Sequence, residues 1–356
     1  MMLFSARLEV LLDLLLKHRH FYPPRYFKLA MTLLICVILQ RSIKKEERFY
    51  QEKVQHLDIV DDPVFITGHW RSGTTYLHYL MSLDIDNFAY PTNYQCFFPT
   101  LYLTFNEQSW LYKLLNRLMG IRTRVIDNME LRLDLPQEEE WMYPPEGGFS
   151  YILEKLIFPR TAITDYNKII ELSNDKRTKE ITLKIFKKLT YAYHKRILSK
   201  SPGHFSRIPT LKELFPNGKF LFIVRNPYDV VLSMMHAGKI LGRMLSLQRS
   251  EPDDVTSIAK FLMFYFDTMH KHIQLLQPND HVLLRYEDLI QDPIKNIENI
   301  YNTFGFPYTN NFENSLRGYL ESVKDYKRNR FDLGADTKDL IYRHCQRIFD
   351  EYSYPR

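Results

Sequence analysis

The chain has 356 residues, of which 45% are hydrophobic, so it is long and apolar enough to bury a large core and is not expected to be disordered. Its net charge of +6 is spread along the sequence without a DNA- or RNA-binding motif, and we expect no nucleic-acid partner. The three cysteines stand apart and form no zinc-binding pattern, which predicts that the protein holds no metal.

Residues 1–55 are predicted to form an N-terminal helical segment. It contains two apolar stretches, Leu8 to Leu16 and Leu29 to Leu39, flanked by Lys and Arg. Each is shorter than the roughly 20 residues that span a bilayer, so we expect the segment either to contact a membrane surface or to pack on the domain formed by residues 56–356. The chain has no N-x-[ST] sequon and few cysteines, which favours the cytoplasm over a Golgi-type membrane anchor.

Residues 63–80, PVFITGHWRSGTTYLHYL, are typical of a buried strand, a tight loop between Gly68 and Gly73, and a helix. The backbone N–H groups of such a loop and the positive end of the helix dipole converge on an anion. The glycine spacing equals that of an ATP-binding P-loop. However, Thr74 stands where that loop has its lysine, and the basic residue lies inside the loop as Arg71. The loop therefore indicates a donor other than a triphosphate; a P-loop kinase and an ordinary strand-to-helix turn are the alternatives.

Two distinctive segments follow along the chain. Residues 133–145, LDLPQEEEWMYPP, carry an acidic run that, taken alone, favours a solvated helix start. Residues 166–199 are expected to be helical. Residues 197–220, ILSKSPGHFSRIPTLKELFPNGKF, contain a K-S-P-x-H sequence and lead into the next predicted strand.

That strand, Phe220 to Val224, is followed by Arg225 and by a helix that Asn226 and Pro227 open. Asn is a favoured N-cap and Pro a favoured first helical residue. Arg225 is therefore expected at the carboxyl end of the strand, where open α/β sheets bind ligands, and Ser233 about two turns into the helix. Both side chains would then meet one phosphate. A helix-start ion pair between Arg225 and Asp229 is the alternative.

A third strand, loop and helix are predicted in residues 281–306, with Asp292 as the cap and Pro293 as the first helical residue. The apolar runs at 64–67, 219–224 and 281–285 alternate with helical stretches. This alternation predicts parallel strands joined by right-handed crossovers.

Taken in order, these segments resemble the sulfotransferases that use 3′-phosphoadenosine 5′-phosphosulfate (PAPS). The family patterns that they resemble are P-[KR]-[ST]-G-T-T, P-Q-E-[DE]-E-F, L-K-S-P-x-H-L, R-[ND]-P-x-D-V-V-x-S, and Y-E-D before a D-P helix start. Of the first four, R-[ND]-P-x-D-V-V-x-S is matched at every position. The likeness covers roughly residues 60–350. It implies an α/β fold with a P-loop-like parallel sheet flanked by helices on both faces, and helical insertions at 88–160 and 235–280 that form the acceptor pocket.

The resemblance also implies which residues bind the donor. Those for its 5′ phosphosulfate are Arg71, Ser72, Gly73, Thr74 and Thr75. Those for its 3′ phosphate are Arg225 and Ser233, and those for its adenine are Tyr76 and Tyr286. A basic cluster near the C-terminus offers Arg328 or Lys327 to close over the 3′ phosphate, although a solvated charge run is equally consistent with it.

For the chemistry, Lys200 and Arg71 are candidates to stabilise charge on the leaving oxygen. The general base is either His204, in the K-S-P-x-H sequence, or a glutamate of the acidic run, Glu139 or Glu140. The sequence does not decide between them.

The implied activity is transfer of a sulfuryl group to a hydroxyl acceptor, which is a small molecule, a lipid or a glycan. Two other functions remain open: a metal-dependent P-loop kinase, and a catalytically silent, membrane-bound interaction protein that keeps the anion-binding loop.

Overall fold

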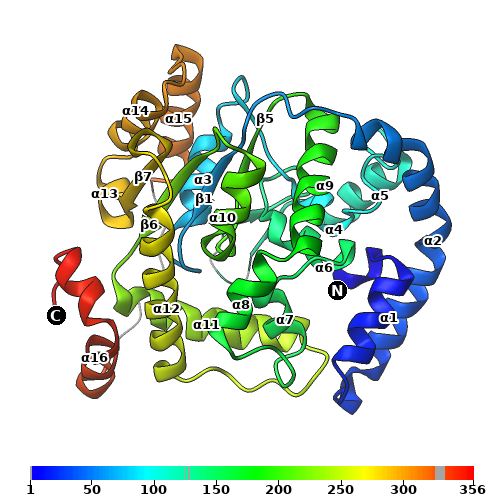
Figure 1. Ribbon diagram of the computed structural model, residues 1–356, viewed down its shortest axis with the longest axis horizontal. Coiled ribbons are helices and arrows are strands. Elements are labelled where there is room, and N and C mark those ends of the chain that lie inside the picture. Colours follow the sequence, from blue (N-terminus) through cyan, green and yellow to red (C-terminus); the bar gives the residue numbers. More distant parts are fainter. Residues whose placement is uncertain (1, 125, 127–128, 325–332) are drawn as a thin grey trace. The chain divides into compact units, whose positions relative to one another are not determined.

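The computed structural model describes residues 2–124, 126, 129–324 and 333–356 (Figure 1). The chain forms two compact units. Unit 1 comprises Met1–Asp61, Tyr90–Ile197 and Lys239–Glu251, and unit 2 comprises Asp62–Ala89, Leu198–Gly238 and Pro252–Arg356. The expected division into residues 1–55 and 56–356 stays a prediction, because both units combine distant segments of the chain.

A five-stranded sheet has the order β2-β5-β1-β6-β7. Its strands are β1 (Val64–Thr67), β2 (Phe88–Ala89), β5 (Arg196–Lys200), β6 (Lys219–Val224) and β7 (His281–Arg285). β1 pairs in parallel with β5 and with β6, and β6 pairs in parallel with β7. The three predicted strands are therefore confirmed as parallel neighbours.

β5 corrects one expectation. The stretch predicted to be helical contains α8 (Tyr166–Ser173) and α9 (Lys176–Tyr193), and then becomes a strand. The reason is local, because His194 has a left-handed φ of 50° and ends α9. Arg196–Lys200 then extends beside β1, where Leu198 pairs with Val64.

Helices cover both faces of the sheet. On one face, Val64, Ile66, Leu221 and Ile223 share a buried cluster with α3 (Thr74–Ser82), α14 (Pro293–Phe304) and α15 (Asn310–Ser322). On the other face, Phe65 contacts the ring of His204 at the start of α10 (His204–Leu214). α12 (Val255–Ile273) packs on α10, and α16 (Ala335–Glu351) packs on α12. The expected α/β fold is thus confirmed.

Two helix starts in unit 2 follow the predicted chemistry. α11 (Pro227–Leu245) begins at its proline, and Asn226 Oδ1 accepts the Tyr228 N–H at 2.9 Å. α14 begins at Pro293, and the Asp292 carboxylate accepts the Lys295 N–H at 3.1 Å. A short helix, α13 (Tyr286–Gln291), directly follows β7.

Unit 1 is largely helical. Its N-terminal apolar stretches lie in α1 (Leu8–Lys17) and in one continuous 30-residue helix, α2 (Tyr26–Gln55). Together with α7 (Tyr151–Ile157) these helices share a buried cluster that includes Leu11, Cys36 and Leu153. The remaining named elements of this unit are η1 (Met2–Ser5), η2 (Pro23–Arg25), α4 (Asn93–Phe97), α5 (Trp110–Met119), β3 (Arg122–Thr123), β4 (Glu130–Leu131), η3 (Glu139–Met142) and α6 (Tyr143–Glu146).

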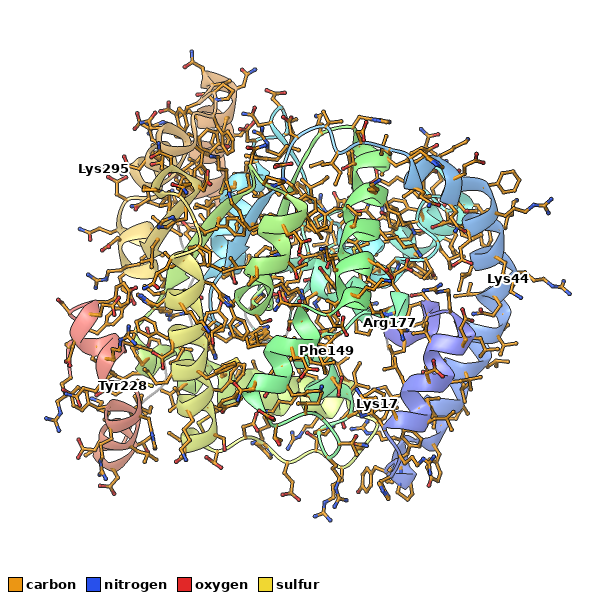
Figure 2. All side chains as sticks on the ribbon, in the orientation of Figure 1. Lys17, Lys44, Phe149, Arg177, Tyr228 and Lys295 are labelled. Atoms are coloured by element: carbon orange, nitrogen blue, oxygen red, sulfur yellow. The ribbon has the colours of Figure 1, made fainter. Side chains whose placement is uncertain are left out.

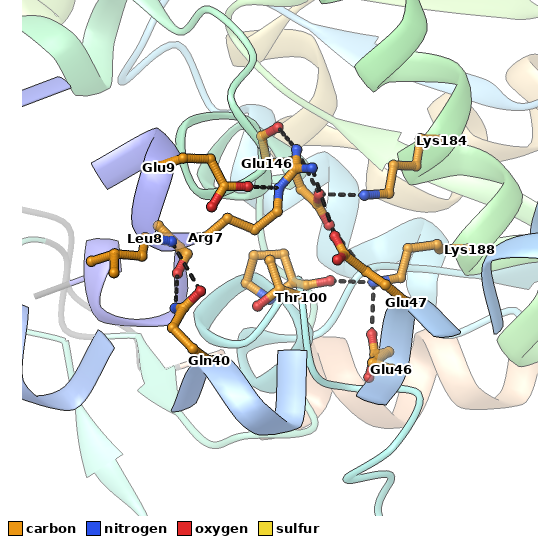
Figure 3. A network of polar contacts seen from close by, with 12 residues as sticks. Arg7, Leu8, Glu9, Gln40, Glu46, Glu47, Thr100, Glu146, Lys184 and Lys188 are labelled. Carbon is orange, nitrogen blue, oxygen red and sulfur yellow. Dashed lines mark hydrogen bonds and ion pairs between the residues drawn. The ribbon is translucent and has the colours of Figure 1, made fainter. Parts of the chain in front are cut away.

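Buried ion pairs hold the helices of unit 1 together (Figure 3). Lys188 of α9 lies 2.8 Å from the Glu46 carboxylate of α2 and 3.7 Å from Glu146, and Lys184 lies 2.7 Å from Glu146. Burial alone would raise the pKa of Glu146, but the two ammonium groups and Arg7 outweigh it and hold that pKa below its usual value. Removing one partner would therefore leave the remaining buried charges with less opposite charge around them.

Candidate active site

The loop between β1 and α3 has the backbone of an anion cradle. Arg71 has a φ of 73° and Gly73 a φ of 103°, both left-handed, and the Ser72 N–H donates to the His69 carbonyl at 3.0 Å. Left-handed residues in such a loop turn successive backbone N–H groups toward one point, where an anion can bind. A left-handed arginine costs about 1 kcal/mol, and such strain is typical of functional loops.

Gly73 cannot be replaced without disturbing the loop. A Cβ atom at this position would lie 2.2 Å from Cδ2 of Tyr286. The loop therefore packs directly against the tyrosine at the start of α13, and only glycine fits this approach.

The second predicted element meets the first at the carboxyl end of the sheet. Arg225 Nη1 donates to the Arg71 carbonyl at 3.2 Å, and Arg71 Nε donates to Ser233 Oγ at 2.8 Å. The Arg225 guanidinium lies 4.5 Å from the ring centre of Tyr286 and 3.1 Å from the Asp229 carboxylate. Four predicted donor-binding residues thus lie in one cluster, and the helix-start ion pair exists beside it.

Lys200 reaches the same loop from β5. It is the last residue of that strand, its side chain is 2% exposed, and its Nζ donates to Thr75 Oγ1 at 3.4 Å. Burying a lysine ammonium costs free energy unless an opposite charge or hydrogen-bond acceptors compensate it, so buried lysines are uncommon. Lys200 therefore brings a third cationic group to the cradle from the neighbouring strand.

Three other predicted residues of this segment differ in exposure. Ser72 and Thr74 have buried side chains, so an anion in the loop would meet their backbone N–H groups. Tyr76 is half-buried and packs against the cluster that covers this face of the sheet.

The candidate bases have different surroundings. The ring of His204 is fully buried, its Nε2 lies 2.9 Å from Ser199 Oγ, and its edge contacts Phe65. It therefore lies on the sheet face opposite α3. Glu139 and Glu140 open η3 within unit 1 and are 0% and 1% exposed, so they are not the solvated helix start that an isolated acidic run favours.

The sequence did not predict two residues that support the turn after Arg225. Glu287 accepts the Asn226 N–H at 3.1 Å and the Tyr354 hydroxyl at 3.0 Å, and so braces the turn that follows Arg225. Burial raises the pKa of Tyr354, which keeps this phenol a donor. The Y-E-D sequence pointed to this region, but nothing in it indicated a partner 67 residues further along the chain.

The predicted C-terminal contacts, Arg328 and Lys327, lie outside the described residues, and their role stays a prediction. Among the residues that are described, no group of three or more His, Cys, Asp or Glu side chains is arranged to hold a metal ion. Arg71, Arg225 and Lys200 bring positive charge to the loop, an arrangement that suits an anion.

The comparisons with known proteins agree with this geometry. A family model described as "Sulfotransferase family" matches residues 63–310. The omega-hydroxy-beta-dihydromenaquinone-9 sulfotransferase Stf3 of Mycobacterium bovis is 34% identical over 315 residues, which is 86% of this chain and 79% of the relative.

Solved structures share the fold. Sulfotransferase STF9 from Mycobacterium avium has a TM-score of 0.69 at 16% identity, with 93% of this chain and 86% of that chain covered. Sulfotransferase STF1 from Mycobacterium tuberculosis H37Rv has a TM-score of 0.62 at 16% identity, with coverages of 94% and 89%. The family match spans more than half of the sequence, so the chain belongs to the sulfotransferase family.

Proposed function

We propose that the protein transfers a sulfuryl group from PAPS to the hydroxyl of a lipid-like acceptor. The observation that carries the proposal is the 2.8 Å bond from Arg71 Nε to Ser233 Oγ, because it joins the loop after β1 to the helix after β6. These two elements are suited to the two ends of one nucleotide that carries phosphate groups on both its 5′ and 3′ sides.

In this proposal the donor's 5′ phosphosulfate lies in the loop from Arg71 to Thr75, and its 3′ phosphate lies against Arg225 and Ser233. A guanidinium and a hydroxyl are good partners for a phosphate, and the ring of Tyr286 keeps the guanidinium oriented. Tyr76 is half-buried, and its ring is our candidate to stack on the adenine.

The transfer breaks one bond and forms one. The acceptor oxygen attacks sulfur, the bond from sulfur to the bridging oxygen breaks, and the donor leaves as 3′,5′-diphosphoadenosine. As in phosphoryl transfer, such a loose transition state depends chiefly on positioning and charge stabilisation. Lys200, beside the Thr75 hydroxyl, supplies positive charge for the leaving oxygen.

The acceptor proton goes to a base, and we assign this role to Glu139 or Glu140. His204 is the weaker candidate because its ring packs against Phe65, on the sheet face opposite α3. Glu139→Gln, Glu140→Gln and His204→Asn should be compared at saturating donor. Replacing the glutamate that acts as base should lower kcat by at least about hundredfold while the affinity for the donor is retained. If only His204→Asn does so, the assignment is wrong.

The lipid-like acceptor rests on the relative from Mycobacterium bovis, whose name specifies a hydroxylated dihydromenaquinone. An identity of 34% across most of both chains makes an acceptor of the same chemical class the best-supported choice. Cytoplasmic residence is part of the proposal, since Cys36, Cys96 and Cys345, all among the described residues, are buried thiols that form no disulfide.

Calorimetry with 3′,5′-diphosphoadenosine, beside ATP with Mg²⁺, tests the donor. We expect the diphosphoadenosine to bind at least about hundredfold more tightly, since only it engages both elements. Tighter binding of ATP with Mg²⁺ would instead identify a kinase. Incubation with radiolabelled PAPS and fractionated extracts then tests the acceptor. The label should enter the organic-soluble fraction, and label confined to water-soluble products would refute the lipid acceptor while leaving the donor assignment intact.

A further inference from the structure

The two units differ in the hydrophobic surface that they expose. The described residues include 18 large hydrophobic side chains that are exposed, and only Ile85 and Leu275 of these belong to unit 2. Ten lie on or between α1 and α2: Leu12, Leu16, Tyr22, Tyr26, Phe27, Met31, Leu34, Val37, Ile38 and Phe49. Large exposed apolar patches of this kind mark interaction surfaces.

α2 has an inner and an outer apolar face. Its inner face, which includes Thr32, Cys36 and Ile43, is buried within unit 1. On the outer face, Phe27 is 79% exposed and Ile38 is 65% exposed. Together with Met31 and Leu34, these residues follow the spacing of three and four that aligns side chains along one side of a helix.

The charges beside this outer face are positive. Between one and three turns beyond Ile38, α2 exposes four basic side chains, Arg41, Lys44, Lys45 and Arg48, together with Phe49. Figure 2 shows Lys44 extending away from the helix. An apolar stretch followed by a cationic stretch is complementary to a lipid surface with anionic headgroups.

We propose that the outer face of α2 lies in the plane of an anionic bilayer and docks the protein on its surface. The segment Pro23–Gln55 is long and apolar enough to cross a membrane, but two features favour lying on it instead. The apolar part, residues 26–40, is about 22 Å long as a helix and so is shorter than the hydrocarbon core. The inner face is also fixed to unit 1.

Three polar contacts fix that inner face. Gln40 Nε2 donates to the Ala6 carbonyl at 3.1 Å, Glu46 pairs with Lys188 at 2.8 Å, and the Gln55 carbonyl accepts from Lys187 at 2.6 Å. A spanning helix would have to break them. The proposed docking goes beyond sulfuryl transfer and does not depend on it, because it is measured by lipid binding alone.

Sedimentation with phosphatidylcholine vesicles, with and without phosphatidylglycerol, tests the proposal. The wild type should bind the vesicles that contain phosphatidylglycerol. Leu34→Glu/Ile38→Glu should bind them at least about tenfold more weakly, because it places charge in the apolar face. Ile85→Glu/Leu275→Glu, which makes the same changes on unit 2, should bind like the wild type. Unchanged binding of 3′,5′-diphosphoadenosine or an unchanged unfolding midpoint shows that each variant is folded.

The cationic stretch is tested separately. Arg41→Glu/Lys44→Glu/Lys45→Glu should lose the preference for phosphatidylglycerol, by about fivefold for each cation removed. The proposal is overturned if the wild type does not bind vesicles or if the Leu34/Ile38 variant binds as well as the wild type. It is also overturned if these variants only convert a dimer to a monomer, since a second copy of the chain would then cover the face.

The orientation of the helix is tested with environment-sensitive dyes on Phe27→Cys, Leu34→Cys and Ile38→Cys. The natural cysteines are buried, and burial raises the pKa of Cys345 to about 12, so the introduced thiols are labelled preferentially. Quenchers placed at different depths in the bilayer should find the three dyes at similar, shallow depths. A steady change of depth along the helix would indicate a span and contradict the proposal.

Discussion

Units 1 and 2 both contain Lys and Arg side chains with little exposure, but these side chains have different kinds of partner. In unit 1, Lys188 is 7% exposed and pairs with Glu46 and Glu146, which are 3% and 2% exposed, so these charges join helices. In unit 2, Arg71 and Lys200 each donate to a hydroxyl, and Arg225 donates to a backbone carbonyl and pairs with the half-exposed Asp229. All three lie at the carboxyl end of the sheet. The buried charges of unit 1 thus hold helices together, whereas the cationic side chains of unit 2 surround the strained loop after β1.

Their surfaces differ in a matching way. Of the large apolar side chains that are exposed among the described residues, most belong to unit 1, and unit 2 carries the predicted donor residues that are described. We therefore expect substitutions in the buried ion pairs and on the outer face of α2 in unit 1 to change stability and lipid binding. Substitutions at the carboxyl end of the sheet in unit 2, and of the proposed base Glu139 or Glu140 in unit 1, should change nucleotide binding or catalysis.

The largest effect is expected for Glu146→Gln. It leaves Lys184 and Lys188 beside a neutral amide inside unit 1, which should destabilise the protein by about 3 kcal/mol or more. Chemical denaturation followed by circular dichroism measures this change. Lys168→Gln removes an exposed pair with Glu171 in the same unit and should change stability by less than about 1 kcal/mol. Equal effects of the two variants would refute the structural role of the buried network.

The same carboxylate predicts how stability depends on pH. Because the pKa of Glu146 is lower in the folded protein than its usual 4.5, its contribution is present above pH 4.5 and is lost as the pH falls through the folded value. Denaturation measured from pH 6 downward should therefore show a steeper loss of stability for the wild type than for Glu146→Gln. Parallel curves would contradict the ion-pair account.

Lys200→Met tests the catalytic role assigned to unit 2. It removes positive charge beside Thr75, and kcat should fall by about 10² to 10³ while the affinity for 3′,5′-diphosphoadenosine changes little. Lys212→Met is the matched control, since Lys212 pairs with Asp280 and is predicted to have no part in transfer. A variant that loses donor affinity but keeps its kcat would show that Lys200 only binds.

Gly73→Ala should lower kcat/KM by about hundredfold, because the new methyl group would overlap Tyr286 and shift the loop. Gly305→Ala is a close control. It also has a left-handed φ, of 70°, but its Cβ would meet nothing within 4 Å. Steady-state kinetics of both variants separate the packing effect from the cost of the dihedral angle. Equal losses would mean that contact with Tyr286 does not matter.

The smallest effect is expected for Asp229→Asn. The Arg225–Asp229 pair involves a carboxylate that is 55% exposed, and exposed pairs contribute less than about 1 kcal/mol. Donor affinity measured by calorimetry should therefore change by less than about fivefold. A loss as large as that of Arg225→Ala would show that Asp229 is required to orient the arginine.

The sequence predicted the parts of the fold that short-range chemistry determines. The apolar runs predicted β1, β6 and β7, and the Asn-Pro and Asp-Pro pairs predicted where α11 and α14 begin. The strand β5 was missed because RILSK contains only two apolar residues and follows a strongly helical stretch. The length of α2 was also missed, although no Gly or Pro interrupts residues 26–55.

The candidate site was predictable only in part, because its contacts are long-range. The motifs indicated Arg71, Arg225 and Ser233, but no local pattern specified that Arg71 would bond to Ser233 across 162 residues. The enclosure of His204 behind the sheet likewise depends on packing with Phe65 and not on the sequence around it. Burial of the glutamates in η3 could not be read from an acidic run either.

The central claim is that the strand ends near Arg71 and Arg225 bind one nucleotide that carries a 3′ phosphate. Calorimetry with 3′,5′-diphosphoadenosine and with adenosine 5′-monophosphate, on the wild type, Arg225→Ala and the surface control Arg317→Ala, tests it most directly. The wild type and the control should prefer the diphosphate by about tenfold to hundredfold, and Arg225→Ala should lose that preference. A wild type that binds both nucleotides equally, or an Arg225→Ala variant that keeps the preference, would contradict the account.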